Sequence, residues 1–339
     1  MPVTCARMNA PSLLRNVWGI YMDDINARLI YLFTDLILPL IVGYLLYQRH
    51  LLSDTTLNRL IRINVVVFFT LLSLFSFWAL PLTRDLLVLP AFFAFIILFP
   101  GFLSWRFLGQ RFHSPIDRGT HLVSALLSNI GTLGGICAYI IYGERGFAYA
   151  QIGGACQNLV LVLLAFPAAQ YYYLLYKNHG RSARLEGRSF LGLLVSWNQL
   201  SLLGMAAGLL LNAANITRPP LLSEAFSYII HIAAWFGMLP VGSLINFRRA
   251  RRFFYLTLDM VLLRFLIVPL AAFLAARIFI NDPIVQNALV IFASVPAAIN
   301  ATLTARLYQL NVDYTIAVFL VTTVLYLTIL FPVTFFMFR

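Results

Sequence analysis

The sequence predicts an all-α membrane protein with ten transmembrane helices. The first observation is composition: of 339 residues, 61% are hydrophobic and 11% are charged, whereas a soluble domain is about 45–50% apolar and about 25% charged. The second is that the apolar residues form long runs, because a helix needs about 20 such residues to cross a bilayer. The third is that these runs are continuous and do not alternate with a period of two, which excludes transmembrane strands.

Charged residues, or Pro and Gly, separate ten apolar runs. We expect helices at 29–48, 57–79, 85–104, 119–142, 147–172, 189–213, 222–246, 254–278, 284–309 and 314–337. Residues 1–28 lack the pattern of a cleaved signal peptide, and we expect them to be an extracytoplasmic N-terminal segment. The remaining chain is predicted to form a first five-helix unit at 29–172, a cytoplasmic linker at 173–188 and a second five-helix unit at 189–339.

The 24 Lys and Arg residues are divided unevenly between the two predicted sides. Fifteen lie in the odd-numbered connections, eight lie on the opposite side, and Arg264 lies within a run. Because positively charged loops stay in the cytoplasm, both termini are predicted to be extracytoplasmic. This pattern indicates a multi-pass protein of the cell membrane, with a bacterial inner membrane expected. It also accounts for the net charge of +12, so nucleic acid is not expected as a partner.

Motifs for catalysis and cofactor binding are not found in the sequence. The cysteines, Cys5, Cys137 and Cys156, have no metal-ligand spacing. There is no phosphate-binding Gly-Lys-Ser/Thr loop and no His-x-x-Glu-His run. We therefore expect no metal site, no cofactor, no enzymatic activity and no ATP-driven pumping.

The two halves of the sequence share features in the same order. Gly43 and Gly208 are 165 positions apart, and Pro167 and Pro332 have the same separation. We interpret this order as a repeat of five helices. Since five is odd, the second unit would be inverted in the membrane, as in secondary transporters whose sites lie on interrupted helices near the midplane. The site is therefore expected on the fourth and ninth runs.

Those two runs contain the strongest helix-breaking residues. In a helix, Gly costs about 1 kcal/mol and Pro about 3 kcal/mol relative to Ala, and freed backbone groups need partners in hydrocarbon. We expect an unwound centre in each run, with half-helix N-termini that favour anions. The alternative is that the small residues only allow close helix packing. The predicted substrate-binding residues on these runs are Asn129, Gly131, Thr132, Gly134, Gly135, Ser294, Pro296, Asn300 and Thr302.

At these residues the sequence resembles the auxin efflux carrier family, in its short bacterial form. The resemblance rests on 39–53, 128–150, 263–276 and, most specifically, 294–332. It implies a fold similar to that of bile-acid/sodium symporters and sodium/proton antiporters. In that fold broken helices four and nine cross in a moving domain, and helices one, two, six and seven form a scaffold that is often dimeric. The chain departs from the plant carriers because it lacks their long central loop and has Gly134-Gly135 where many relatives have proline.

Other polar residues in the apolar runs add candidates. Gln157 and Asn158 lie in the fifth run at the depth of the predicted break. Amides in membrane helices commonly bond to neighbouring helices. The other interpretation, which we adopt, includes them in the substrate site.

Four ionisable residues are candidates for ion coupling or for a charge partner, because charges inside a membrane are costly and usually functional. Arg264 would either anchor its helix by reaching the headgroups or pair with an anionic substrate or a carboxylate. Asp35 would couple a cation or proton, or it would cap a helix or line a pore near the interface. Asp259 would have a transport role, lie at the interface, or pair with Arg252 or Arg264. His231 would act as a protonation switch or form a structural hydrogen bond.

Together these features predict a secondary or uniporting carrier of a small organic anion, a carboxylate or auxin-like acid, with an elevator-type alternating-access mechanism. We also expect coupling to Na⁺ or H⁺ and a homodimer formed through helices one, two, six and seven. Two alternatives stay open. One is a cation-coupled carrier resembling the Na⁺/H⁺ antiporters, and the other is a transport-inactive membrane sensor on the same fold.

Overall fold

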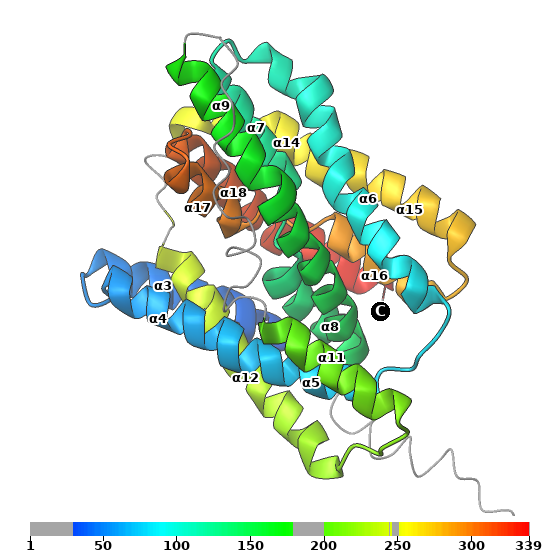
Figure 1. The fold of residues 1–339 in the computed structure, drawn as a ribbon. Coiled ribbons are helices and arrows are strands. Elements are labelled where there is room, and N and C mark those ends of the chain that lie inside the picture. The colour runs from blue at the N-terminus through cyan, green and yellow to red at the C-terminus, as the bar shows by residue number, and fades with distance from the viewer. Residues whose placement is uncertain (1–29, 179–199, 244, 246–250, 339) are drawn as a thin grey trace, which may run out of the picture.

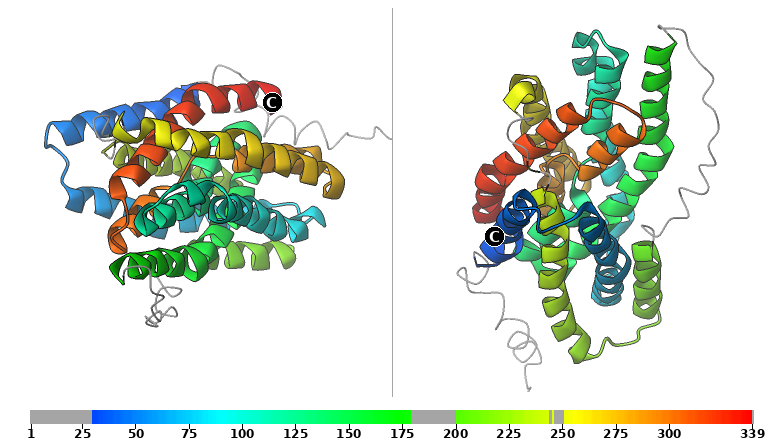
Figure 2. Two further views of the ribbon diagram at one scale, coloured as in Figure 1. Left: turned by 90° about the horizontal axis from the view of Figure 1, so that it is seen from above. Right: turned by 90° about the vertical axis from the view of Figure 1, so that its left-hand side faces the viewer.

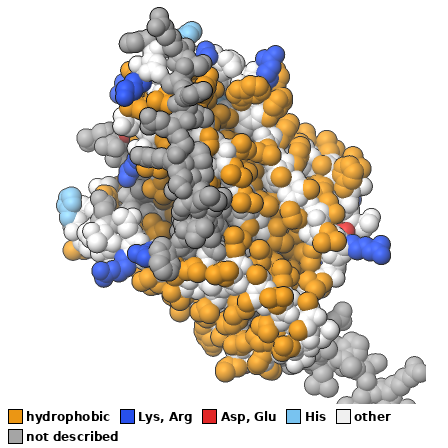
Figure 3. All heavy atoms as spheres, viewed as in Figure 1, with side chains coloured by type: hydrophobic (Ala, Val, Ile, Leu, Met, Phe, Trp, Pro, Cys, Tyr) orange, Lys and Arg blue, Asp and Glu red, His pale blue; other side chains and the backbone are white. Residues whose placement is uncertain are grey.

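The computed structural model describes residues 30–178, 200–243, 245 and 251–338, and these residues form helices and connections without a strand. Among them, six helices are long and apolar enough to cross a membrane: Thr55–Ala79, Asp85–Arg111, Ile130–Lys177, Pro220–Ser243, Arg251–Phe279 and Val312–Phe338. Three shorter apolar helices accompany them: Leu32–Gln48, Leu200–Ala213 and Pro283–Ala293. Hydrophobic side chains cover much of the face shown in Figure 3. The prediction of a helical, multi-pass membrane protein is therefore confirmed at this level.

Five helices and two π-helical turns pack together into what we call the side bundle (Figure 1; Figure 2). Its elements are η1 (Leu32–Ile37), α3 (Leu38–Gln48), α4 (Asp54–Ile63), η2 (Asn64–Phe68), α5 (Phe69–Ala79), α11 (Leu200–Ala213) and α12 (Pro220–Ser243). Glycines bring its helix pairs close, as small residues do in membranes. A Cβ on Gly208 of α11 would lie 2.5 Å from the carbonyl oxygen of Leu74 in α5, and one on Gly43 of α3 would lie 2.0 Å from that of Leu239 in α12.

The other described helices form the crossing bundle, in the upper part of Figure 1. In the first half of the chain its elements are α6 (Asp85–Arg106), η3 (Leu108–Arg111), α7 (Pro115–Leu126), η4 (Ile130–Gly134), α8 (Gly135–Val160), η5 (Leu161–Ala165) and α9 (Phe166–Lys177). In the second half they are η7 (Phe254–Thr257), α14 (Leu258–Leu262), η8 (Leu263–Ile267), α15 (Val268–Phe279), α16 (Pro283–Ala293), α17 (Ile299–Leu307), α18 (Val312–Leu325), η9 (Tyr326–Leu330) and α19 (Phe331–Phe338).

One glycine divides the longest apolar helix. Gly143, inside α8, has a φ of 62° and a ψ of −150°, a conformation that glycine adopts without steric cost. The bend separates the predicted fourth and fifth runs. Helix α9 continues to Lys177, five residues into the predicted linker, and the rest of that linker, residues 1–28 and the start of the sixth run lie outside the described residues.

Candidate functional site

Two helices of the crossing bundle are interrupted. Helix α7 ends at Leu126, and η4 begins at Ile130 after three residues outside any helix. Helix α16 ends at Ala293, and α17 begins at Ile299 after five such residues. The sequence predicted an interruption in each of these runs, and both interruptions are present.

The two interrupted segments pair with each other. The amide N–H of Asn129 donates to the carbonyl oxygen of Pro296 (2.8 Å), and the N–H of Ala298 donates to that of Leu127 (2.9 Å), an antiparallel bridge centred on Ser128 and Ala297. A helix end leaves up to four backbone groups without partners, so this pairing satisfies part of what the breaks expose. Both η4 and α17 begin at this crossing, and the aligned peptide dipoles at their N-termini favour negative charge there.

A buried arginine donates hydrogen bonds to the carbonyl groups on the α7 side of the first break. Nη2 of Arg264, on η8, lies 2.9, 2.8 and 2.9 Å from the carbonyl oxygens of Ser124, Ala125 and Leu127, the last turn of α7. The side chain is 2% exposed, and its Nε has no hydrogen-bond partner. None of the ion pairs among the described residues includes Arg264. Its charge therefore faces backbone carbonyls and not the headgroups or a carboxylate.

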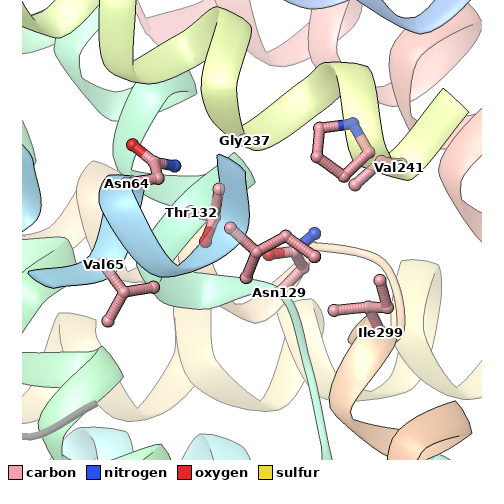
Figure 4. A pocket seen from close by; sticks show the side chains of 9 residues that line it. Asn64, Val65, Asn129, Thr132, Gly237, Val241 and Ile299 are labelled. Carbon is pink, nitrogen blue, oxygen red and sulfur yellow. The ribbon is translucent and has the colours of Figure 1, made fainter. Parts of the chain in front are cut away.

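A small cavity of about 60 Å³ lies where the side bundle faces the crossing (Figure 4). Its lining is Ile61, Asn64, Val65, Asn129, Thr132, Gly237, Pro240, Val241 and Ile299. Asn64 of η2 is 3% exposed, and its Oδ1 has no partner. A Cβ on Gly237 would lie 3.0 Å from both Asn64 Nδ2 and Thr132 Cγ2, so the glycine leaves room between these side chains. The amide of Asn129 also accepts from the N–H of Leu133 (3.3 Å), which caps η4.

Only part of the predicted substrate site lines this cavity. Asn129 and Thr132 do, whereas the other predicted residues support the crossing or lie outside the lining. Gly134 lets the breaks approach, because a Cβ there would lie 3.1 Å from Val295 Cγ1, and Gly135 packs on Phe147. Asn64 was missed as a site residue; its signal was an amide in an otherwise apolar run.

The remaining predicted polar residues have identifiable positions. Gln157 accepts from Ser128 Oγ (3.3 Å) but leaves its Nε2 unpartnered, and Asn158 is half-buried. The carbonyl oxygen of Gly131 accepts from Gln151 Nε2 (3.2 Å). Ser294 donates to the carbonyl oxygen of Val290, and that of Asn300 accepts from Thr304 Oγ1. Pro296 and Thr302 are buried.

The predicted ion-coupling residues other than Arg264 lie outside the cavity lining, in one pair and one cluster of three residues. Asp35 Oδ2 lies 2.5 Å from His231 Nδ1, which joins η1 to α12. Asp259 Oδ2 lies 2.8 Å from His121 Nε2 and 2.9 Å from Arg111 Nη2. Of the interpretations left open for Asp259, pairing with Arg252 or Arg264 is not found among the described residues, because Asp259 instead contacts α7 and η3, which are distant in sequence.

A second contact joins the two bundles. Rings of Tyr139 and Phe147, from α8, pack on Phe226 of α12 with centroids 5.7 Å apart in each case. Beside the bend in α8, both carboxylate oxygens of Glu144 accept from the guanidinium of Arg218, at 2.5 and 3.1 Å. Arg218 is anchored to the side bundle by bonds to the carbonyl oxygen of Phe75 and to Ser223 Oγ.

Metal binding has no support in the described residues, which contain no group of three or more His, Cys, Asp or Glu side chains able to hold an ion. No family model matches the chain, and no curated protein matches it.

Proposed function

We propose that the chain is a secondary or uniporting carrier of a small organic anion. The observation that carries the proposal is the crossing of two interrupted helices, where two helix N-termini and an arginine without an acidic partner meet, next to a small cavity lined in part by Asn64, Asn129 and Thr132. Backbone that leaves helical geometry at membrane depth is tolerated where it is buried in protein or lines a cavity. Such interrupted helices are where secondary transporters bind their substrates.

The proposed architecture is ten transmembrane helices in two inverted five-helix repeats. In each half the fourth apolar run is the interrupted one, and the breaks pair in antiparallel fashion through Ser128 and Ala297. An antiparallel meeting of equivalent segments is what an inverted repeat would produce. The expected homodimer through helices one, two, six and seven belongs to the same proposal.

The chemistry around the cavity supports an anion of small size. Helix N-termini favour negative charge, and the amides of Asn64 and Asn129 provide N–H donors without placing a full charge in the cavity. A volume of about 60 Å³ is far below the roughly 300–1,000 Å³ of pockets for drug-sized ligands. A short carboxylate fits this space better than a large aromatic acid.

The cavity and the aromatic contact between the bundles lie towards opposite faces of the membrane. In the continuous helix α4–η2–α5 the cavity lies at Asn64, and in α12 it lies near the end, at Pro240. The aromatic contact lies further along the first helix, at Phe69, and earlier in the second, at Phe226. With the predicted orientation, the cavity is on the cytoplasmic side, and the aromatic contact and the Glu144–Arg218 pair close the outer side. Alternating access then requires the crossing bundle to move against the side bundle and to break that pair.

The test is uptake of labelled carboxylates by proteoliposomes, with and without Na⁺ or pH gradients. We expect at least one short carboxylate to be transported, and Asn129→Ala and Thr132→Val to reduce its uptake by about tenfold or more. Thr328→Val is the matched control, because Thr328 is exposed and bonds only within its own helix. The carrier proposal fails if no anion moves under any gradient.

A further inference from the structure

A second, larger cavity lies between the two bundles, away from the crossing. It has a volume of about 540 Å³. The side bundle contributes its wall from the end of α5 and from α11, and the crossing bundle contributes the start of α6 and one residue of α8. Its lining is Phe77, Leu80, Leu82, Thr83, Arg84, Leu86, Leu87, Pro90, Ile152, Met205 and Leu209.

The lining is apolar except at one end. Thr83 and Arg84 immediately precede α6, and Pro90 lies five residues into it, or roughly 8 Å at 1.5 Å per residue. Arg84 is exposed and takes part in none of the ion pairs of the described residues. The neighbouring Asp85 instead accepts from the backbone N–H of Asp282 (3.2 Å). The cavity thus has one cationic end and an apolar body.

We infer that this groove binds an acyl chain of an anionic phospholipid, with the lipid phosphate at Arg84. An amphiphile with an anionic head and a long apolar tail would place its head at Arg84 and its tail along the apolar lining. Phospholipids are amphiphiles of this kind and surround any apolar groove that is open to the membrane. Inside the bilayer the acyl chain gains van der Waals packing against the apolar lining, and each basic residue near the headgroups favours an anionic lipid. In the predicted orientation, the end of α5 and the start of α6 lie on the outer side of the membrane. The lipid therefore belongs to the outer leaflet, opposite the side where the cavity at Asn64 lies.

The position gives the lipid a structural consequence. Met205 and Leu209 belong to the side bundle, whereas Leu86, Leu87 and Ile152 belong to the crossing bundle. A chain in the groove contacts both bundles and fills space that any relative movement would change. Binding itself does not depend on transport, so it can be tested without a transported substrate.

The experiment measures lipid retention by native mass spectrometry of the purified, delipidated full chain. Phosphatidylglycerol and phosphatidylcholine with identical acyl chains are added in turn. We expect the wild type to retain one phosphatidylglycerol about fivefold more tightly than phosphatidylcholine, and Arg84→Gln to remove this preference. Met205→Trp, which fills the groove, is expected to remove retention of both lipids.

Matched controls are available at the same end of the molecule. Arg277 and Leu274 are exposed on α15 and do not line the groove, so Arg277→Gln and Leu274→Trp should retain lipid as the wild type does. Equal retention by the wild type, Arg84→Gln and Met205→Trp would overturn the site. Equal loss in Arg84→Gln and Arg277→Gln would overturn it as well, because general surface charge would then explain the preference.

Discussion

Replacing Arg264 with methionine tests the interpretation of the crossing most directly. Nη2 of Arg264 is within hydrogen-bond distance of three carbonyl oxygens at the end of α7, and its two protons are shared among them. Methionine keeps much of the side-chain length but cannot donate. The carbonyl groups of Ser124 and Ala125 would therefore lose these donors in an environment without water, while that of Leu127 would keep the N–H of Ala298.

The expected cost follows from these contacts. Two hydrogen bonds from a charged donor contribute about 1.5–3 kcal/mol each, while removal of a buried charge returns part of its desolvation penalty. We expect a net loss of about 2–4 kcal/mol in the free energy of unfolding, a large fraction of a typical total of about 5–15 kcal/mol. Arg264→Lys keeps the charge but has a compact head in place of the planar fork, so it should lose about half as much.

Reversible unfolding in mixed micelles, followed by circular dichroism, measures these differences. Arg277→Met is the control, because this exposed residue lies at the end of α15 and should change stability by less than about 0.5 kcal/mol. If Arg264→Met were as stable as the control, the assignment of Arg264 as the partner of the broken helix would be refuted.

Two further predictions concern contacts between helices. Glu144→Gln should weaken the contact with Arg218 and increase exposure of the outer side. In a background without native cysteines, Phe226→Cys would then react faster with a membrane-impermeant maleimide, and an unchanged rate would contradict the role of the pair. Gly43→Ala should cost about 1–3 kcal/mol because the new Cβ would overlap the Leu239 carbonyl group. In the same unfolding assay, Gly131→Ala should cause no such loss of stability, because the nearest neighbour of its new Cβ would lie 3.6 Å away.

Local features of the sequence were sufficient to predict the helices and the two breaks. An apolar run must match the bilayer thickness, so the described helices lie within a few residues of the expected ranges. The Ser-Asn-Ile-Gly segment and Pro296 were informative because they weaken helical structure without any help from distant residues. The bend at Gly143 followed from the same local reasoning, since the two runs beside it are separately long enough to cross.

The partners of the breaks could not be predicted in the same way. The contacts of Arg264 join residues 137–140 positions apart, and no local pattern indicates which helix end an arginine will reach. The contribution of Asn64 likewise depends on how η2 packs against α12 and the crossing. Gln157 lies at the depth of the break, as expected, and bonds with Ser128, but it does not line the cavity.

The electrostatics of the crossing distinguish between the proposed anion carrier and a carrier for cations. A cation in the cavity would have no carboxylate to offset its charge, because the lining has only amide and hydroxyl side chains as its polar groups. The predicted coupling carboxylates, Asp35 and Asp259, lie outside the lining and are each paired with histidine. The charge of Arg264, which has no carboxylate among its partners, favours an anion over a cation at the crossing.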